Sequence, residues 1–381
     1  MAPLTVAKVE QQNSPCTLHG GNQYLGEALP PVTSLRQAVL LTLAYFDAQG
    51  LAVSAFDVWF NLIGYRTNLH AVALELEQPA VRERLVEHDG YYSLRSREQV
   101  ELRQLKHKVS EFKWRRARWV ASLLSLVPFI ESVAVCDSVA LNKARQESDI
   151  DFLIVARPGR MWTARLLATS LTHVLRLRRH GRAVRDRACL SFYVTSDNLS
   201  LEPLVIAGGD LYLAHWVYTA TPLWECPRPD RLELTRRLRQ ANAWAAQFFP
   251  QLSHGAGRTI TERRLVKPWV ARFSRVVQAL AEVILRGKLG QHLELRLRRW
   301  QLRYMHKTAP FELKNRTCHI VINDRMLKFH EQDRRTWFRE RTLTTYERLT
   351  GEQDLLEQVE DMRFVPAGLV VQPVGATLSL R

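Results

Sequence analysis

The chain has 381 residues, and its 54 Lys and Arg against 38 Asp and Glu give a formal net charge of +16. Hydrophobic residues make up 46% of it, which excludes a wholly disordered chain and allows cores for two or three domains. The charge favours a polyanionic partner, namely nucleic acid, a nucleotide or an anionic membrane surface. A basic protein without such a partner remains the alternative.

Cysteine spacing and hydropathy exclude several other classes. None of the five cysteines forms a CxxC pair, so a zinc site of the usual spacing is not indicated. The N-terminus has no apolar signal segment. The longest apolar stretch, residues 119–130, is shorter than the roughly 20 residues that a bilayer requires. These features predict a cytoplasmic protein without a membrane span.

The first hundred residues divide into an arm and a small module. Residues 1–30 lack sustained periodicity and are expected to be a flexible N-terminal arm. Within residues 31–100, three helical patterns precede a tight-turn signal at Asp89-Gly90. This order predicts a winged-helix-like module, although a plain helical bundle would also fit.

The next region, residues 101–228, changes from helical to mixed character. One long basic helix is expected over residues 98–127, ended by Pro128. Its cations form either a solvated face or a face that contacts phosphates. Beyond it, apolar runs predict strands at 131–136, 149–156 and 189–195, with a helix at about 160–180 between the last two.

The remaining chain looks mostly helical. We expect a helix from Tyr212 that stops before Pro222, and then a basic helical C-terminal region over residues 229–381. The apolar tail at 364–381 is predicted to be an added strand or a docked arm.

A pair of aspartates carries the clearest chemical signal. Asp149 and Asp151 lie two residues apart at the start of an expected strand, so both side chains share one face. Two carboxylates so close repel each other unless a divalent cation compensates them. The preceding strand leads to Ser138 and a helix start, which together offer donors for an anion. Metal-binding carboxylates beside a phosphate cradle are the minimum equipment for nucleotidyl transfer.

This stretch resembles the DNA polymerase β superfamily of nucleotidyltransferases. The family pattern is a strand, Gly-Ser, a spacer of about ten residues, and then Asp-hydrophobic-Asp at a strand start. Here Ser138, the spacer 139–148 and Asp149-Ile150-Asp151 match in order and spacing, and the resemblance covers about residues 119–225. It implies an α+β nucleotidyltransferase fold with a short mixed sheet, between the winged-helix-like and helical regions.

The resemblance also implies roles for individual residues. Asp149 and Asp151 would be catalytic and would hold Mg²⁺ or Mn²⁺. Ser138, Lys143 and Arg145 would bind the nucleotide. The reaction would move a nucleoside monophosphate from a nucleoside triphosphate to a hydroxyl of RNA, DNA or protein.

Two departures from the family pattern leave the activity open. Asp137 replaces the family's glycine, and an acidic side chain there should repel a triphosphate. The family's third carboxylate would fall near Ser191, so Asp186 or Asp197 would have to supply it, and Asp186 is the preferred third catalytic residue. The alternative is an inactive nucleotidyltransferase-like module that binds nucleic acid or a protein partner.

Overall fold

The computed structural model describes residues 29–94, 97–226, 233–253, 266–285, 287–308, 320–329 and 333–351. The expected arm over residues 1–30 lies almost entirely outside these ranges, and so does the apolar tail at 364–381. None of the described helices is both long enough and apolar enough to cross a membrane.

The N-terminal module has the predicted helical segments and closing hairpin, but the third segment is divided at Gln78 into two helices, so the structure has four. Ser34 and Ser54 each cap a helix, and each forms a reciprocal capping box with the residue three positions later. Asp89 and Gly90 both have positive φ in the hairpin turn. The strands form one antiparallel sheet in the order β1-β3-β2. The elements are α1 (Leu35–Ala48), β1 (Val53–Ser54), α2 (Ala55–Phe60), α3 (Leu69–Glu77), α4 (Pro79–Arg82), β2 (Val86–His88) and β3 (Tyr91–Ser93).

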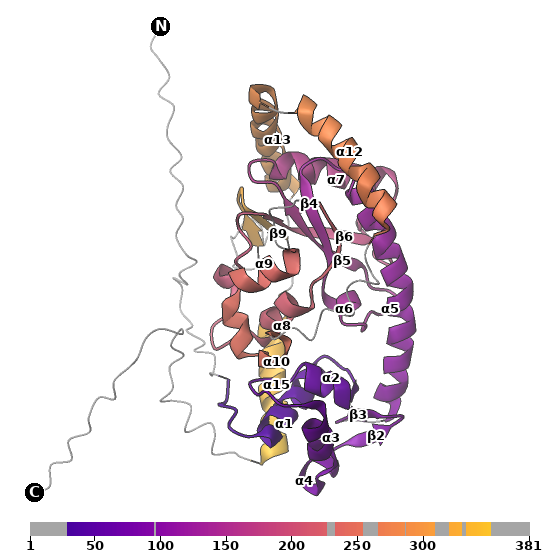
Figure 1. Cartoon of the computed structure of the whole chain (residues 1–381), viewed down its shortest axis with the longest axis vertical. Helices are drawn as coiled ribbons and strands as arrows, with labels where there is room; N and C mark the ends of the chain where they lie inside the picture. Colours follow the sequence, from indigo (N-terminus) through magenta and orange to yellow (C-terminus); the bar gives the residue numbers. More distant parts are fainter. Residues whose placement is uncertain are drawn as a thin grey trace, which may run out of the picture.

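The predicted long helix is confirmed as α5 (Arg97–Leu124). It starts at the N-terminal module and runs along the side of the second part of the molecule (Figure 1). Its inner side chains Trp114, Ala117 and Val120 are buried against that part. The helix therefore joins the two parts mechanically as well as in sequence.

The three predicted strands lie in one sheet, as expected. They are β4 (Ile130–Val135), β5 (Ile150–Ala156) and β6 (Ala188–Thr195), and α7 (Met161–Val174) connects the last two. The full order is β7-β4-β5-β6-β9-β8, in which only β5 and β6 are parallel. The chain is thus an α+β protein with a mixed sheet.

Three strands were not predicted. The expected helix ends earlier, as α8 (Leu211–Thr219), and β7 (Thr221–Glu225) follows it with Pro222 inside. A proline is tolerated there because β7 is an edge strand. The C-terminal region, expected to be helical, contributes the hairpin of β8 (Ile320–Ile322) and β9 (Met326–Phe329), which extends the sheet at its other edge.

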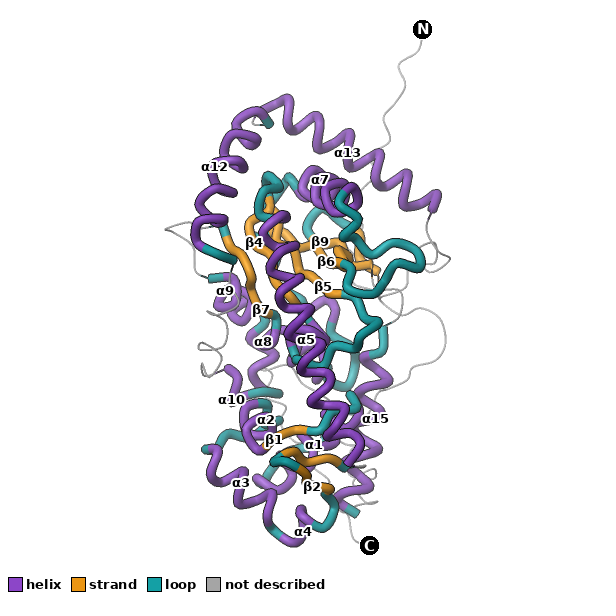
Figure 2. The backbone as a smooth tube through the Cα atoms, turned by 90° about the vertical axis from the view of Figure 1, so that its right-hand side faces the viewer, coloured by secondary structure: helices purple, strands orange, loops and turns teal. Residues whose placement is uncertain are grey.

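Helices cover both faces of the sheet (Figures 1 and 2). One core holds side chains from α5 and α7, and the other holds side chains from α1, α8 and α15. The last helix, α15, packs along α1, so the C-terminal region also contacts the N-terminal module. The C-terminal helices are α9 (Leu234–Ala241), α10 (Pro250–Ser253), α12 (Pro268–Ile284), α13 (Gly287–Thr308) and α15 (Arg335–Thr350), and short 3-10 helices lie at Glu202–Leu204 and Ala243–Gln247.

Candidate functional site

The two aspartates of the motif converge with a cysteine from the neighbouring strand. Asp149 immediately precedes β5, Asp151 is its second residue, and Cys189 lies beside Asp151 in the parallel pairing of β5 and β6. One carboxylate oxygen from each aspartate and the Cys189 Sγ all lie within 4.8 Å of one another. Three potential ligand atoms at this separation can hold a single metal ion.

The charges of this cluster are incompletely compensated. Burial, together with the negative charges of Asp149 and Asp137, raises the pKa of Asp151 to about 8. Burial and the charge of Asp151 also raise the pKa of the Cys189 thiol. The negative charge of Asp149 is partly compensated, because the Arg179 Nη1 donates to its Oδ2 at 2.8 Å. A divalent cation would favour the ionised form of both aspartates, so the carboxylate pair fits Mg²⁺ or Mn²⁺, whereas the Cys189 thiol is a ligand for softer metals such as Zn²⁺.

The identity of the third ligand is what the sequence analysis missed. The resemblance places the family's third carboxylate near Ser191, but the residue in register with Asp151 is Cys189. A register irregularity between Asp151 and Leu153 shifts the pairing in this part of the strand. Ser191 instead accepts a hydrogen bond from the Cys189 Sγ at 3.2 Å. Counting residues along a strand cannot reveal such a shift.

The two acids considered as substitutes occupy other places. Asp186 receives the buried ammonium group of Lys113 at 2.6 Å and lies 3.5 Å from the Arg185 Nε. It is not part of the Asp149–Asp151–Cys189 cluster. Asp197 is exposed in the turn after β6, eight residues beyond Cys189, a span of about 26 Å along an extended chain. The structure therefore brings neither carboxylate into the cluster.

Asp137 keeps the backbone conformation of the glycine that it replaces. Its φ is +56°, in the left-handed region that glycine adopts most easily and that aspartate tolerates. Its carboxylate accepts a hydrogen bond from the Tyr212 hydroxyl at 2.6 Å and lies 3.8 Å from the Lys143 Nζ. These partners counter the repulsion that its charge would exert on a phosphate.

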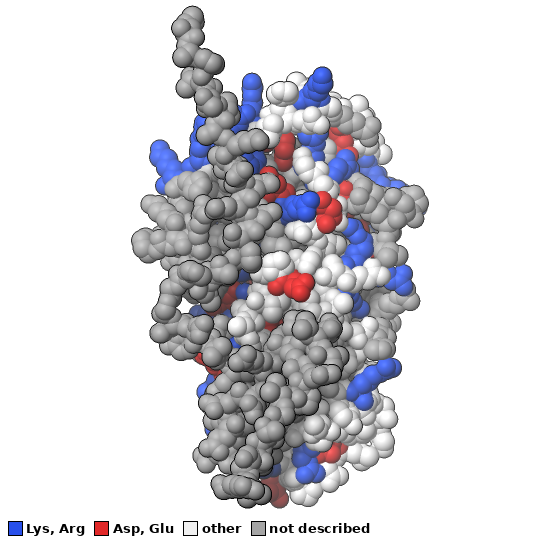
Figure 3. Space-filling view, turned by 90° about the vertical axis from the view of Figure 1, so that its left-hand side faces the viewer, with Lys and Arg blue, Asp and Glu red and all other residues white. Residues whose placement is uncertain are grey.

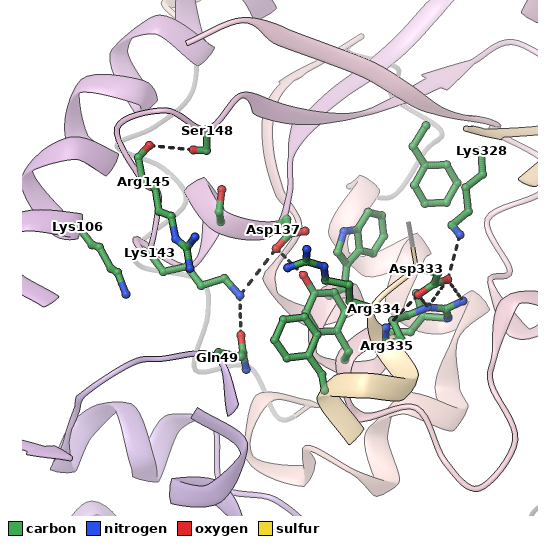
Figure 4. A pocket seen from close by; sticks show the side chains of 16 residues that line it. Gln49, Lys106, Asp137, Lys143, Arg145, Ser148, Lys328, Asp333, Arg334 and Arg335 are labelled. Atoms are coloured by element: carbon green, nitrogen blue, oxygen red, sulfur yellow. Dashed lines mark hydrogen bonds and ion pairs between the residues drawn. The ribbon is translucent and has the colours of Figure 1, made fainter. Parts of the chain in front are cut away.

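A cavity of about 350 Å³ opens next to the aspartate pair (Figure 4). It lies between the N-terminal module, the start of α6 (Asp137–Ala140), α8 and the start of α15. Ser148 lines it and directly precedes Asp149, so the cavity and the carboxylate cluster adjoin. The lining residues are Gln49, Lys106, Asp137, Ser138, Lys143, Arg145, Ser148, Phe192, Tyr212, Leu213, Trp216, Lys328, Asp333, Arg334, Arg335 and Phe338.

Cations dominate the polar lining of this cavity. Burial lowers the pKa of Lys106, and the positive charges of Arg145, Arg103 and Lys143 lower it further. Burial likewise lowers the pKa of Lys143, despite its contacts with Asp137 and with the Gln49 Oε1 at 2.5 Å. The lining has six Lys and Arg side chains but only two aspartates, so the cavity favours an anionic ligand.

Aromatic side chains complete the cavity. Tyr212 stacks on Phe338 with ring centroids 5.2 Å apart, and the Lys143 Nζ lies 5.5 Å from the Tyr212 centroid. Trp216 packs beside Phe192 on the same side. Flat apolar walls beside cations suit a ligand that has both an aromatic ring and a charged group.

The structure thus gathers most residues that the sequence singled out. Ser138, Lys143 and Arg145 all line the cavity, and Asp149 and Asp151 lie together beside it. The parts that the sequence analysis did not find come from distant segments, namely Cys189, Tyr212 and the start of α15. Comparisons of the chain with protein-family models, with curated proteins and with solved structures find no match.

Proposed function

We propose that the protein is a nucleotidyltransferase that uses a divalent cation, Mg²⁺ or Mn²⁺. The observation that carries this proposal is that the acidic pair Asp149 and Asp151 directly follows Ser148, which lines the cationic cavity. A metal-bound nucleoside triphosphate carries the complementary charges in the same order, since its cation lies on the phosphates.

The fold supports the same reading. The strand–Ser138–spacer–DxD pattern is built into β4, α6 and β5, and β6 lies parallel beside β5. This is the arrangement that a nucleotidyltransferase fold of the DNA polymerase β superfamily requires for its metal ligands. The positive φ of Asp137, at the position of the family's glycine, agrees with it.

Each set of residues has a part in substrate binding. Asp149 and Asp151 would hold the cation, which when bound neutralises phosphate oxygens, since Mg²⁺ and Mn²⁺ prefer oxygen ligands to the Cys189 thiol beside them. Ser138, Lys143 and Arg145 would hold the β- and γ-phosphates, and among the described residues the Arg145 guanidinium makes no hydrogen bond or ion pair that would have to break. Tyr212 and Phe338 would offer ring faces to the base.

The chemistry is a substitution at the α-phosphorus. The acceptor hydroxyl gives its proton to solvent, its oxygen forms a bond to this phosphorus, the bond from the phosphorus to the bridging oxygen breaks, and pyrophosphate leaves with the electron pair of that bond. The protein contributes orientation and charge compensation, because little covalent chemistry is required of it.

The N-terminal module bears on the acceptor. Its order of elements and its sheet order are those of a winged-helix-like domain. The helix that such domains place in the DNA groove would be α3, but α3 carries Glu75 and Glu77 and no Lys or Arg. Three cations of the basic helix α5, Lys106, Lys113 and Arg116, bond to other parts of the protein. RNA or DNA as an acceptor would therefore depend on other basic surfaces, and a protein hydroxyl is an equally good acceptor.

Label transfer tests the proposal. The full chain is incubated with α-labelled nucleoside triphosphates, Mn²⁺ or Mg²⁺, and cellular RNA and protein. Label transfer is expected in wild type and lost in Asp149→Asn, while the matched surface variant Asp197→Asn retains it. Absence of transfer with every triphosphate and acceptor would contradict the enzymatic function.

A second candidate is a module that binds nucleotide without turnover. Cys189 favours it, because a thiol stands where the active family members have a carboxylate that helps bind metal and activate the acceptor. Cys189→Asp distinguishes the two functions. If wild type binds nucleotide but transfers no label and Cys189→Asp gains transfer, the natural protein is the binding module.

A further inference from the structure

The helix α12 has buried polar side chains on its inner side and large exposed apolar side chains on its outer side. Its buried side includes Gln278 and Glu282. The Gln278 Nε2 donates to the backbone oxygens of Val127 and Ile130 at 2.7 and 3.1 Å. Glu282 accepts from the Phe129 backbone N at 3.1 Å and pairs with the Arg157 Nη1 at 2.7 Å. Polar bonds therefore attach much of this helix to the protein.

The outward side of α12 is apolar along its whole length. Large side chains follow one another at intervals of three and four residues, so they form one stripe. The exposed fraction of each is between 59% and 71%, and such a continuous exposed patch marks an interaction surface. The stripe consists of Trp269, Phe273, Val276, Leu280, Val283 and Ile284.

The adjoining helix α13 also exposes large apolar side chains. Leu289 and Trp300 are exposed on it, while its Glu294 is buried and accepts from the backbone N of Trp162 at 2.8 Å and of Thr163 at 2.9 Å. Both helices lie at the end of the molecule away from the N-terminal module (Figures 1 and 2). The stripe on α12 and these exposed side chains of α13 are together called the outer apolar surface.

Every exposed charge that the structure describes on these two helices is positive. The two acidic residues of α12 and α13, Glu282 and Glu294, are both buried in ion pairs or hydrogen bonds. Lys and Arg side chains project at this end of the molecule (Figure 3). The exposed cations are Arg272, Arg275, Lys288, Arg296, Arg299, Arg303 and Lys307.

We propose that the outer apolar surface binds an anionic lipid membrane, with α12 lying in the plane of the interface. Apolar side chains that include tryptophan, flanked only by cations, are the composition that such interfacial helices have. A second copy of the chain fits less well, because two such surfaces would bring cations against cations with no exposed acid on either helix to pair with them. Nucleic acid fits less well too, since the aliphatic side chains of Val276, Leu280 and Ile284 make no hydrogen bond or ion pair with its phosphates. This proposal is independent of the proposed catalytic function.

Vesicle sedimentation tests the proposal with the full chain. The chain is expected to pellet with vesicles of equal phosphatidylglycerol and phosphatidylcholine, and at least tenfold less with phosphatidylcholine alone. Phe273→Ser with Leu280→Ser should weaken this binding at least tenfold and leave the circular dichroism spectrum unchanged, because both side chains are exposed.

A matched control uses another pair of exposed apolar residues one heptad apart on a helix. Leu105 and Phe112 on α5 are 57% and 54% exposed, so Leu105→Ser with Phe112→Ser should bind vesicles like wild type. Failure of wild type to pellet with anionic vesicles, or equal loss in both double variants, would overturn the proposal. If wild type is a dimer in light scattering and does not bind vesicles, and only the α12 double variant is a monomer, the surface binds a second copy of the chain.

Discussion

Two neighbouring parts of the candidate site carry opposite charge imbalances. In the aspartate cluster, burial and like charge raise the pKa of Asp151 to about 8, so the cluster has too few positive charges. In the cavity, burial and neighbouring positive charges lower the pKa of Lys106, so negative charges in the cavity are too few to balance the positive ones. Both imbalances persist although partial compensation is present, from Arg179 in the cluster and from Asp137 in the cavity.

The contrast shows what kind of ligand the site lacks. If the two parts existed only to stabilise the fold, the simplest arrangement would pair their charges with each other. They are instead kept apart by the turn of residues 141–149, with the cavity on one side. Imbalances of opposite sign, held side by side at some cost in stability, are typical of sites that a ligand completes.

The largest expected effect is the loss of metal binding when the aspartate pair is neutralised. Asp149→Asn with Asp151→Asn should weaken Mn²⁺ binding more than about 100-fold, because both carboxylate ligands lose their charge. Calorimetric titration with Mn²⁺ measures this, and Asp197→Asn is the control. Equal Mn²⁺ affinity in wild type and double variant would place the metal elsewhere.

The cationic part should be separable from the acidic part. Lys143→Ala and Arg145→Ala should each weaken triphosphate binding about tenfold, the size expected for a lost hydrogen bond between charged groups. Neither should change Mn²⁺ binding in the absence of nucleotide. Arg84→Ala, an exposed residue of the N-terminal module, serves as the matched control. Loss of Mn²⁺ binding in Lys143→Ala would show that the cavity and the aspartate cluster do not act separately, and would contradict this prediction.

The imbalance at Asp151 also predicts how stability depends on pH. Its pKa is raised in the folded protein, so the folded state binds the proton more tightly than the unfolded state does. The stability that this provides is complete below about pH 4, and it is lost as the pH rises toward 8. Without metal, Asp151→Asn should melt several degrees above wild type at pH 8, and the difference should shrink at pH 4.5. An equal difference in melting temperature at both pH values would show that the pKa of Asp151 is not raised in the folded protein.

The smallest effect on binding is expected at Asp186, the residue first considered as a third catalytic carboxylate. Its carboxylate holds the buried ammonium group of Lys113, so Asp186→Asn should lower the melting temperature and leave Mn²⁺ affinity within about twofold. Lys113→Met should destabilise the protein by about 3–5 kcal/mol, because it leaves one side of a buried pair alone. Loss of Mn²⁺ binding in Asp186→Asn at full stability would restore it to the metal site.

Local patterns in the sequence predicted the parts of the fold that short-range physics determines. The turn at Asp89-Gly90, the long helix α5 and the strands β4, β5 and β6 all have local causes. The edge strands β7 and β8 were missed, together with β9 next to β8, because such short strands depend on the sheet that they join. The hairpin of β8 and β9 did leave a signal, since Asn323 and Asp324 separate two apolar runs.

The site divides in the same way. Ser138, Lys143, Arg145, Asp149 and Asp151 lie within fourteen consecutive positions, and one motif located them all. Cys189 and Tyr212 reach the site only through strand register and helix packing. The exposure of the apolar stripe on α12 could not be predicted either, because periodicity reveals that a helix has an apolar face but not that this face points outward.

The most direct test of the central claim is calorimetry of nucleoside triphosphate binding with and without Mn²⁺. If the two parts of the site share one metal–nucleotide ligand, Mn²⁺ should tighten nucleotide binding at least tenfold in wild type, and nucleotide should tighten Mn²⁺ binding by the same factor. This coupling should vanish in Asp149→Asn with Asp151→Asn. Nucleotide binding of equal strength with Mn²⁺ and with chelator, or coupling that survives in the double variant, would contradict the account.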